Sequence, residues 1–525
     1  MKMIFIYGPM GSGKSRVGRK LAENINAQYF DLEQKIEAAE GRSIPEIISN
    51  LGMEKFIEIE ANNLFELIGE HSNINGNTKT IISLGSGTLL KDENKLKCEE
   101  AGIIICLDPS ELVLGRNLNS DFFKTPLLTE DMDIRLKSLQ DFRGNHYKTF
   151  KLRIANDPSM NIDQISAEIQ NLIGYFWISG MTNGYDVIIQ KGIIRSVGNV
   201  IEENQLNGAV FIVCDENVEG FYAHQLAQTI AKSGHSVYSH AIKAGEDSKN
   251  LEIVSEIWNK LLVAGIDRKS AILALGGGVV SDVTGFVSAT FMRGCSWIII
   301  PTSLLSMIDA SIGGKTGFDF KNGKNLIGTF YSPRVVLIDP ELLATLPAEE
   351  FRSGMAEVVK HGIIGDPELF DICSKGLDYV KNNLTDVITR AIAVKVKIIK
   401  EDPYEKEFRA SLNFGHTIGH AVESASKYKI RHGEAVSIGM VAETLLSEKL
   451  GLVKKEGNKL SSQIRLTLSN LGLPTEIPKE LSRQEIISIM ALDKKKEQNI
   501  VKFSLPIDIG LIKVGVPVED LEGVL

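Results

Sequence analysis

Short apolar runs alternate with helical patterns through the first third of the chain. Residues 3–7, 80–84 and 102–107 have the pattern of strands, and amphipathic stretches lie between them. This alternation predicts a parallel sheet with crossover helices. Residues 157–173 form a last amphipathic stretch, which we interpret as a closing helix. The pattern therefore predicts an α/β domain over residues 1–173.

A turn-rich segment, GYFWISGMTNG, follows at residues 174–184, and we interpret it as a linker. Beyond it, strand-like runs at residues 185–189, 209–214, 271–275, 297–300 and 335–338 predict a second α/β region. After about residue 340 these runs give way to long helical patterns at residues 344–364, 378–400 and 410–425, continuing to 449. We predict an α/β lobe over residues 185–340 and an all-helical lobe over residues 341–525.

The composition narrows the class of protein. A chain of 525 residues is too long for one hydrophobic core, and its 43% hydrophobic and 24% charged residues are typical of a soluble globular protein. The net charge of -9 and the pI of about 5.7 argue against nucleic acid as the main partner. In such an acidic chain, a local cluster of Lys and Arg indicates an anionic small-molecule substrate.

Cysteine usage and the chain start indicate the compartment. The five cysteines are scattered and form no C-x-x-C pair, which is typical of a reducing compartment without a disulfide framework or a thiolate zinc site. The apolar start is too short for a signal peptide, and no apolar run reaches the roughly 18–20 residues of a membrane span. We expect a soluble, cytoplasmic protein without a membrane partner.

A phosphate-binding motif lies at the N-terminus. Residues 8–15 read GPMGSGKS, which fits G-x-x-x-x-G-K-[ST] between a predicted strand and a predicted helix. The backbone N–H groups around Gly11, Ser12 and Gly13 would surround the phosphates, with help from the positive end of the helix. Lys14 would contact the outer phosphates, and the Ser15 hydroxyl would bind Mg²⁺. The motif predicts a nucleotide but not the acceptor.

Residues 1 to about 172 resemble shikimate kinase. The matching segments are the phosphate loop, FDLE at 30–33, GRSIPEI at 41–47, residues 52–60, GSG at 85–87, TPLL at 125–128 and RGNHY at 143–147. The resemblance implies a three-layer α/β/α P-loop kinase fold that transfers phosphate from ATP, with Mg²⁺, to shikimate. It assigns the acceptor to Glu33, Gly87 and Arg143, and it makes Asp31 the base or a carboxylate near the metal. Taken alone, Asp31 could also be the N-cap of the next helix.

The match departs from the family at positions that bind the acceptor. Where the family has an Arg after Phe, this chain has Ile57, and where the family has the lid Arg, it has Thr125. Ser86 replaces one of the family's glycines, and Glu33 replaces the second Asp of its acidic pair. Two arginines would clamp the shikimate carboxylate, and bidentate Arg–carboxylate pairs are hard to replace. Of that pair only Arg143 remains.

Lys124 and Arg116 lie close enough in sequence to substitute for the missing cations. Three interpretations stay open for this domain: a working shikimate kinase, a degenerate nucleotide-binding or structural module, and a kinase with another acceptor.

Three of the chain's nine histidines lie close together in the second half. His416 and His420 are four residues apart, so they share one face of a helix, and His432 follows after a short loop. With the upstream carboxylate of Glu357 they could form a His₂Glu metal site that keeps a position open for substrate. The alternative is a set of histidines on a helix face without a metal.

A glycine-rich turn and a set of cations precede the histidines. The run AILALGGGVVSD at residues 271–282 is a strand that leads into glycines, which suits backbone approach to a pyrophosphate. Asp215 ends an earlier predicted strand, where carboxylates commonly bind ribose, although a plain turn Asp has the same pattern. Several cations of this half lie mostly in apolar or glycine-rich segments: Arg293, Lys315, Lys324, Lys360 and Arg409. We interpret them as ligands for a phosphorylated carboxylate rather than as a solvated basic face.

From residue 185 onward the chain resembles 3-dehydroquinate synthase. The matching segments, all in family order, include GGGVVSD at 276–282, PTSLLSMID at 301–309, SIGGKT at 311–316, GMAEVVKHG at 354–362, LNFGHTIGHA at 412–421 and HGEAV at 432–436. The resemblance implies an NAD-binding α/β lobe, a helical metal-binding lobe, and a metal that is zinc or cobalt. The implied reaction converts 3-deoxy-arabino-heptulosonate 7-phosphate to 3-dehydroquinate and phosphate, with NAD regenerated.

The resemblance also assigns residues. Glu357, His416 and His432 correspond to the metal ligands, and Arg293 to a residue that reaches the substrate of a neighbouring subunit in a homodimer. The residues assigned to the substrate and its reaction are Asp309, Lys315, Lys324, Asn325, Lys360, Arg409, Asn413, His420 and Lys494. The residues assigned to NAD are Asp215, Asn217, Glu246, Lys249, Gly278, Asp282, Thr302 and Ser303, with Lys315 and Lys324 beside them. The enzymatic alternatives are another sugar-phosphate cyclase and a metal-dependent polyol dehydrogenase.

Overall fold

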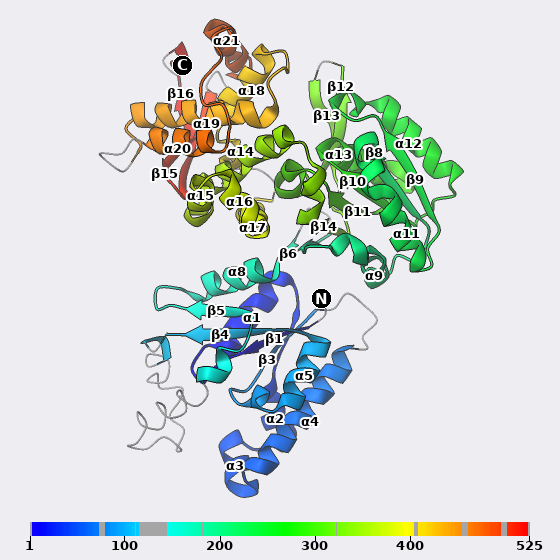
Figure 1. The fold of residues 1–525 in the computed structure, drawn as a ribbon, viewed down its shortest axis with the longest axis vertical. Coiled ribbons are helices and arrows are strands. Elements are labelled where there is room, and N and C mark those ends of the chain that lie inside the picture. The colour runs from blue at the N-terminus through cyan, green and yellow to red at the C-terminus, as the bar shows by residue number, and fades with distance from the viewer. Residues whose placement is uncertain are drawn as a thin grey trace. The chain divides into compact units, whose positions relative to one another are not determined.

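The chain folds into two compact units, residues Met1–Ile173 and Gly174–Leu525 (Figure 1). The structure is a computed structural model, and it describes residues 3–72, 79–110, 112–114, 144–179, 183–321, 323–403, 408–453, 460–494 and 501–522. Among these residues, no helix is long and apolar enough to span a membrane.

The first unit is built on a five-stranded parallel sheet in the order β2-β3-β1-β4-β5. Its strands are β1 Met3–Tyr7, β2 Gln28–Asp31, β3 Thr80–Ser83, β4 Gly102–Pro109 and β5 Arg153–Asn156. Its helices are α1 Lys14–Ile25, α2 Leu32–Glu40, α3 Ile44–Leu51, α4 Met53–Ser72, α5 Asp92–Ala101 and α8 Ile162–Ile173. The strands predicted at residues 3–7, 80–84 and 102–107 and the closing helix are all present.

Helices cover both faces of this sheet. On β1, Met3, Phe5 and Tyr7 share a core with Leu64 and Leu67 of α4. The alternate residues of a strand face the opposite side, where α1 packs on β1 and β3 and contacts α8. The unit is therefore the three-layer α/β/α domain that the resemblance implied.

The second unit contains a seven-stranded sheet in the order β6-β7-β14-β11-β10-β8-β9. Its strands are β6 Tyr175–Ile178, β7 Tyr185–Ile189, β8 Val210–Asp215, β9 Val237–Ile242, β10 Ala271–Gly276, β11 Ser296–Pro301 and β14 Val335–Ile338. All neighbours run parallel except β6, which pairs antiparallel with β7. The strand order reverses between β8 and β10, and ligands of such sheets bind at the carboxyl ends of the strands beside that point.

Part of the predicted linker is a strand. Residues 175–178, which we expected within a linker at 174–184, form β6 at the edge of the sheet, with Tyr175, Phe176 and Ile178 buried. These four apolar residues gain a ladder partner in β7 and bury their side chains, and this gain outweighs the flanking turn residues.

Helices surround the sheet and form most of the remaining structure of the unit (Figure 1). Around the sheet lie α9 Val197–Glu203, α10 Glu216–Val218, α11 His224–Lys232, α12 Leu251–Val263 and α13 Gly278–Thr290. The C-terminal region contains α14 Ala348–Gly365, α15 Pro367–Ser374, α16 Leu377–Asn382, α17 Leu384–Glu401, α18 His416–Ala425, α19 His432–Lys449, α20 Leu460–Asn470 and α21 Arg483–Lys494.

The C-terminal region is helical as predicted, but it also contains a hairpin. Strands β15 Val501–Asp508 and β16 Leu511–Val518 pair antiparallel, so the region is not all-helical. Phe503 and Leu505 of the hairpin are buried against Ile418 and Val422 of α18, and this burial stabilises strands that have no larger sheet. A second antiparallel ribbon, β12 Lys315–Phe320 with β13 Gly323–Phe330, belongs to the α/β lobe, where β12 packs against α13.

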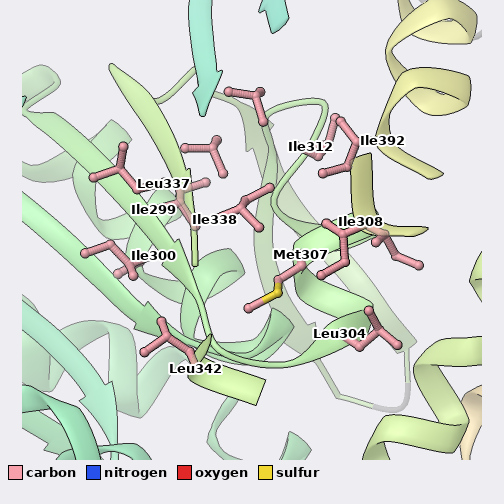
Figure 2. Close-up of a cluster of buried hydrophobic side chains, with 14 of the residues drawn as sticks. Ile299, Ile300, Leu304, Met307, Ile308, Ile312, Leu337, Ile338, Leu342 and Ile392 are labelled. Atoms are coloured by element: carbon pink, nitrogen blue, oxygen red, sulfur yellow. The ribbon is translucent and has the colours of Figure 1, made fainter. Parts of the chain in front are cut away.

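One hydrophobic core joins the sheet to the helical region. Ile299 and Ile300 of β11 and Leu337 and Ile338 of β14 gather with Leu304, Met307, Ile308, Ile312, Leu342 and Ile392 (Figure 2). Ile392 belongs to α17, so the cluster ties a helix of the C-terminal region to the segment after β11. That segment carries Asp309 and Lys315, and the core therefore fixes two predicted site residues.

Candidate active sites

The phosphate loop of the first unit has the expected geometry. It connects β1 to α1, and Gly8, Gly11 and Gly13 have φ values of 145°, 78° and 84°, which residues with a Cβ rarely adopt. A Cβ at Gly8 would lie 2.7 Å from the carbonyl oxygen of Leu107, so the loop also needs glycine for close packing. Lys14 is the first residue of α1 and donates from Nζ to the carbonyl of Pro9 over 3.0 Å.

Two acidic side chains lie near Lys14 of the phosphate loop: Asp31 at the end of β2 and Glu33 on α2. Asp31 caps α2, accepting from the Gln34 N–H over 3.4 Å, and it also accepts from the Tyr29 hydroxyl over 3.0 Å. It therefore combines the N-cap role with a place near Lys14. Burial lowers the pKa of Lys14, while Glu33 and Asp31 raise it. Burial also raises the pKa of Glu33, against the effect of Lys14.

The GSG segment at residues 85–87 borders the predicted site of the phosphate acceptor. A Cβ at Gly85 would lie 2.6 Å from Oε1 of Glu60 and 3.4 Å from Oε1 of Glu33, so two carboxylates converge on this glycine. The carbonyl of Ser86 accepts from the hydroxyl of Tyr147 over 2.8 Å and from that of Tyr7 over 3.2 Å. Gly87 directly precedes a short helical turn, Thr88–Leu90.

Ile57, at the position where the resemblance expects an arginine, lies on α4. Ile57 is 39% exposed, so the position is open to solvent. The cations Arg116, Lys124 and Arg143 and the lid residue Thr125 lie outside the described residues.

Two adjoining clefts in the second unit contain most of the predicted residues. The larger has a volume of about 1270 Å³ and the smaller of about 590 Å³, and Asp282, Ala310 and Asn325 line both. The larger cleft is lined by Asp215, Asn217, Glu246, Lys249, Gly278, Asp282, Thr302, Ser303, Lys324, His420 and His432. The smaller is lined by Asp309, Lys315, Lys360, Arg409, Asn413 and His416.

The larger cleft lies where the strand order reverses. Asp215 ends β8, Gly278 begins α13 directly after β10, and Thr302 follows β11, so all three lie at the carboxyl edge of the sheet. Asp215 accepts from the N–H groups of Asn217 and Val218, each over 3.0 Å, which is the turn role that the sequence left open. The positive end of α13 and its glycines fit a pyrophosphate, and the cleft is large enough for a dinucleotide.

A buried ion pair crosses this cleft. Nζ of Lys249 lies 2.6 Å from Oδ2 of Asp282 and 4.0 Å from Oε1 of Glu246. Burial raises the pKa of Asp282 to about 6, although Lys249 pulls in the opposite direction. The pair therefore fixes two residues that were predicted to hold the cofactor.

Glu357 and two histidines converge at one point. Oε1 of Glu357 lies 3.4 Å from Nε2 of His416 and 3.6 Å from Nε2 of His432. Ligand atoms bound to one zinc ion at about 2.0–2.2 Å in a tetrahedron are about 3.3–3.5 Å apart, so these spacings fit a shared metal. Glu357 is fully buried on α14, and its Oε1 has no hydrogen-bond partner within the described part of the chain. A metal ion would satisfy that oxygen.

A hydrogen-bond acceptor at Nδ1 orients each of the two histidine rings. Nδ1 of His416 lies 3.1 Å from the carbonyl oxygen of Phe414, and Nδ1 of His432 lies 3.2 Å from Oε2 of Glu423. Each acceptor requires a proton on Nδ1, which leaves the lone pair of Nε2 facing Glu357. Ligand atoms of His416, His420 and His432 also lie within 4.8 Å of one another, so His420 stands beside the same point.

Cations crowd the smaller cleft. Lys360, on α14, pairs with Glu357, and Lys395, on α17, pairs with Asp309. Burial disfavours the charge of Asp309, but Lys395 and Lys360 outweigh this effect and hold its pKa well below the usual range. Arg409 is buried and donates from Nη1 to the carbonyl of Pro403 over 3.0 Å. With Lys315 at the rim, the cleft presents four cations to an anionic substrate.

Sequence reasoning missed three charged residues of this site. Lys395 lines the smaller cleft, Glu423 holds both His432 and Lys324, and Glu443 accepts hydrogen bonds from the start of α18. All three lie in helical stretches with ordinary charge patterns. No local signal distinguished them, and only the packing of the helices reveals their contacts.

One predicted residue lies outside both clefts, and the side chain of another is not described. Arg293 is exposed in a turn after α13, with a φ of 66°, and is not among the described residues that line either cleft. The backbone of Lys494 ends α21, but its side chain is outside the description.

Three family models match the chain. Residues 10–173 match the model described as shikimate kinase. Residues 239–353 match the N-terminal model of 3-dehydroquinate synthase, and residues 354–496 match its C-terminal model.

Curated relatives match the second unit over nearly their whole length. The 3-dehydroquinate synthase of Crocosphaera subtropica is 42% identical over 350 residues, which are 65% of this chain and 95% of that protein. The 3-dehydroquinate synthase of Synechocystis sp. is 40% identical over 343 residues, 64% of this chain and 94% of that protein.

Two solved structures are also similar to this chain. A 2-deoxy-scyllo-inosose synthase complexed with carbaglucose-6-phosphate, NAD⁺ and Co²⁺ is 25% identical with a TM-score of 0.60, covering 66% of this chain and 96% of its own. The 2-epi-5-epi-valiolone synthase of Streptomyces hygroscopicus subsp. jinggangensis, with NAD⁺ and Zn²⁺ bound, is 29% identical with a TM-score of 0.58, covering 65% and 95%.

Proposed function

The chain belongs to the 3-dehydroquinate synthase family and carries a shikimate kinase domain at its N-terminus, and from this premise we propose that it is a bifunctional enzyme of the shikimate pathway. The second unit converts 3-deoxy-arabino-heptulosonate 7-phosphate to 3-dehydroquinate and phosphate. The first unit phosphorylates shikimate with ATP and Mg²⁺.

One observation carries the synthase assignment. The buried carboxylate of Glu357 meets two histidine Nε2 atoms between a cleft for a dinucleotide and a cleft lined by four cations. When bound, NAD supplies reversible hydride transfer, and the divalent metal lowers the pKa of substrate hydroxyls. The protein's own contribution is to hold the reacting carbons between these two sites in an enclosed cleft.

We assign the metal, zinc or cobalt, to Glu357, His416 and His432. The support is the spacing of their ligand atoms and the acceptors behind both imidazoles. His420 lies beside this site but is not one of the three assigned metal ligands. This position suits contact with the substrate or movement of a proton.

We assign the substrate's anionic groups to the cations of the smaller cleft. Lys315, Lys360, Lys395 and Arg409 all line it, and two of them are compensated by Glu357 and Asp309. Asn325, Asn413 and Lys324 add polar groups at its border with the cofactor cleft. NAD occupies the larger cleft, between Asp215 at the end of β8 and Ser303 after β11.

In the first unit we assign ATP to residues 11–15, with Ser15 on Mg²⁺ and Lys14 on the outer phosphates. Asp31 and Glu33 lie near Lys14, as the coupling of their charges indicates, and this supports a role for these carboxylates beside the acceptor hydroxyl. Gly87 and Arg143 complete the acceptor assignment from the sequence.

We further propose a homodimer that works in the cytoplasm. Arg293 is exposed outside both clefts of its own chain, as a residue that serves a neighbouring subunit would be. Leu326, Ile327 and Phe330 of β13 are 66%, 40% and 42% exposed, an apolar strand that a second copy could cover. All five cysteines are buried and free, which suits a reducing compartment. Light scattering that shows a monomer would overturn the dimer.

Both activities are tested on the full-length protein. With 3-deoxy-arabino-heptulosonate 7-phosphate and NAD we expect equal amounts of phosphate and 3-dehydroquinate and no build-up of NADH. Loss of activity with a chelator and recovery with Zn²⁺ or Co²⁺ would support the metal site. With shikimate and MgATP we expect shikimate-dependent ADP.

Two variants separate the sites. Glu357→Gln should abolish only the synthase, and Lys14→Met only the kinase. Accumulation of NADH would indicate a dehydrogenase instead, and ATP binding without shikimate-dependent turnover would leave the first unit as a nucleotide-binding module.

A further inference from the structure

A fully buried carboxylate lies behind the metal site. Glu443 is on α19, about three turns beyond His432 on the same helix. Its Oε2 accepts from the N–H of Gly415 over 2.7 Å, and its Oε1 accepts from the N–H of Ile418 over 3.0 Å. Gly415 is the N-cap residue of α18, the helix that begins with His416, and Ile418 lies in its first turn.

The bonds of Glu443 have a clear electrostatic basis. The first N–H groups of a helix have no partner within the helix, and the helix end carries a partial positive charge. Glu443 supplies acceptors for these N–H groups from a neighbouring helix, since no side chain caps the start of α18. Within the described residues, no Lys, Arg or His lies within ion-pair distance of the Glu443 carboxylate, so the backbone of α18 is its partner.

Glycines allow the two helices to approach closely at this point. Gly415 has a φ of 79°, and a Cβ there would lie 2.6 Å from Cγ of Met440. A Cβ at Gly439 would lie 2.0 Å from the carbonyl oxygen of Gly415, and one at Gly419 would lie 3.0 Å from that of Ala435. The start of α18 therefore lies directly on the backbone of α19, with Glu443 at the end of the contact.

This arrangement links the two histidines of the proposed metal site. His432 begins α19, and His416 begins α18, whose start is bonded to Glu443 of α19. Helix α19 thus carries His432 directly and fixes His416 through the carboxyl group of Glu443. We propose that Glu443 is a positioning residue of the metal site, which sets the separation of His416 and His432. The inference rests on the proposed metal assignment and names a residue that the assignment does not contain.

The test is a Co²⁺ titration of full-length apo-protein, read by the visible absorption of the bound ion. Glu443→Ala removes both acceptors. Glu443→Gln keeps the volume but turns an N–H₂ group toward one of the two N–H donors, so one bond is lost. We expect Co²⁺ affinity to fall at least about tenfold in the alanine variant, as for other residues that orient metal ligands, and less in the glutamine variant. We also expect a changed absorption spectrum in both.

Thr444→Val is the matched control. Thr444 is buried on the same helix, one residue further, and its hydroxyl donates to the carbonyl of Met440 within α19. This variant should lose some stability but keep the Co²⁺ affinity and spectrum of the wild type. NAD binding, read by titration, should be unchanged in all three variants and shows that the second unit is folded.

The outcomes separate the two hypotheses. A wild-type protein that binds no Co²⁺ would contradict the metal assignment itself. A wild type that binds Co²⁺, with both Glu443 variants matching its affinity and spectrum, would overturn only the positioning role. If the alanine variant does not fold, the glutamine variant decides the question, because it preserves the packing volume.

Discussion

Nδ1 of His432 lies 3.2 Å from Oε2 of Glu423, and the other oxygen of the same carboxylate lies 3.2 Å from Nζ of Lys324. One side chain thus orients an imidazole of the proposed metal site and a cation of the larger cleft. Glu423→Ala should therefore weaken metal binding by about 10–100-fold, as losses of such supporting groups do. The measurement is the dissociation constant for Zn²⁺ in competition with a chromophoric chelator.

Glu423→Gln is the informative companion. Its amide oxygen can still accept from Nδ1 of His432, but it has no charge to pair with Lys324. We expect metal affinity near that of the wild type and a raised KM for the phosphorylated substrate. An alanine variant with wild-type zinc affinity would show that the bond to His432 has no role in metal binding.

The pair of Lys395 and Asp309 should be essential for stability as well as activity. Lys395→Met leaves the Asp309 carboxylate without its partner, which costs about 3–5 kcal/mol at buried sites. Since the Asp309 side chain is 34% exposed to the cleft, we expect the lower end of this range. The measurement is urea unfolding followed by tryptophan fluorescence, because all three tryptophans lie in the second unit.

A double variant provides the control. Lys395→Met with Asp309→Asn removes both charges and should recover part of the lost stability, although catalytic activity stays low because the cleft has lost a cation. Equal stability of the single and double variants would mean that the two side chains are not coupled.

Asp282 should make the apo-protein less stable as pH rises through about 6. Its pKa in the folded state is raised from 3.8 to about 6 by burial, so the folded state keeps a proton that the unfolded chain has released. Stability linked to this group is complete below about pH 4 and is lost as pH rises through about 6. The loss is on the order of 1–3 kcal/mol.

Asp282→Asn removes this dependence. The difference in free energy of unfolding between the variant and the wild type should grow from pH 4.5 to pH 7.5, with unfolding again followed by tryptophan fluorescence. A constant difference across this range would show that the Asp282 pKa is not raised, for example because Lys249 fully compensates its charge.

The sequence predicted the residues whose chemistry is rare and whose spacing is short. His416 and His420 share a helix face because they are four residues apart, and residues 8–15 form a phosphate loop because glycine and lysine leave few alternatives. Both groups are local, so periodicity and motif suffice. For Glu357 the residues suggested only a possible third ligand, and the resemblance supplied the specific assignment, since a lone carboxylate in a helix carries little signal.

Residues that act through tertiary packing could not be predicted in this way. Lys395 lies in the run KVKIIK, which has the pattern of an ordinary amphipathic helix, yet α17 places it against Asp309. The strand β6 was missed because turn residues flank its four strand-forming residues, and the ribbon β12–β13 was missed because its pairing decides its structure.

The acceptor site of the first unit offers a gain-of-function test. Ile57 takes the place of an arginine, is 39% exposed, and lies one turn before the buried Glu60 on α4. An arginine there could be oriented by Glu60 and present its fork to the shikimate carboxylate. Hydrogen bonds to charged groups contribute about 1.5–3 kcal/mol, so Ile57→Arg should raise kcat/KM for shikimate by roughly 10–100-fold.

Ile57→Lys distinguishes charge from geometry, because lysine offers a point charge without the planar fork. We expect a smaller gain from lysine than from arginine, mainly through KM, measured by coupled detection of ADP. Synthase activity of the same preparations should not change, since Ile57 belongs to the first unit. If arginine brings no gain while the wild type is already fast, other groups bind the carboxylate and the missing arginine has been replaced.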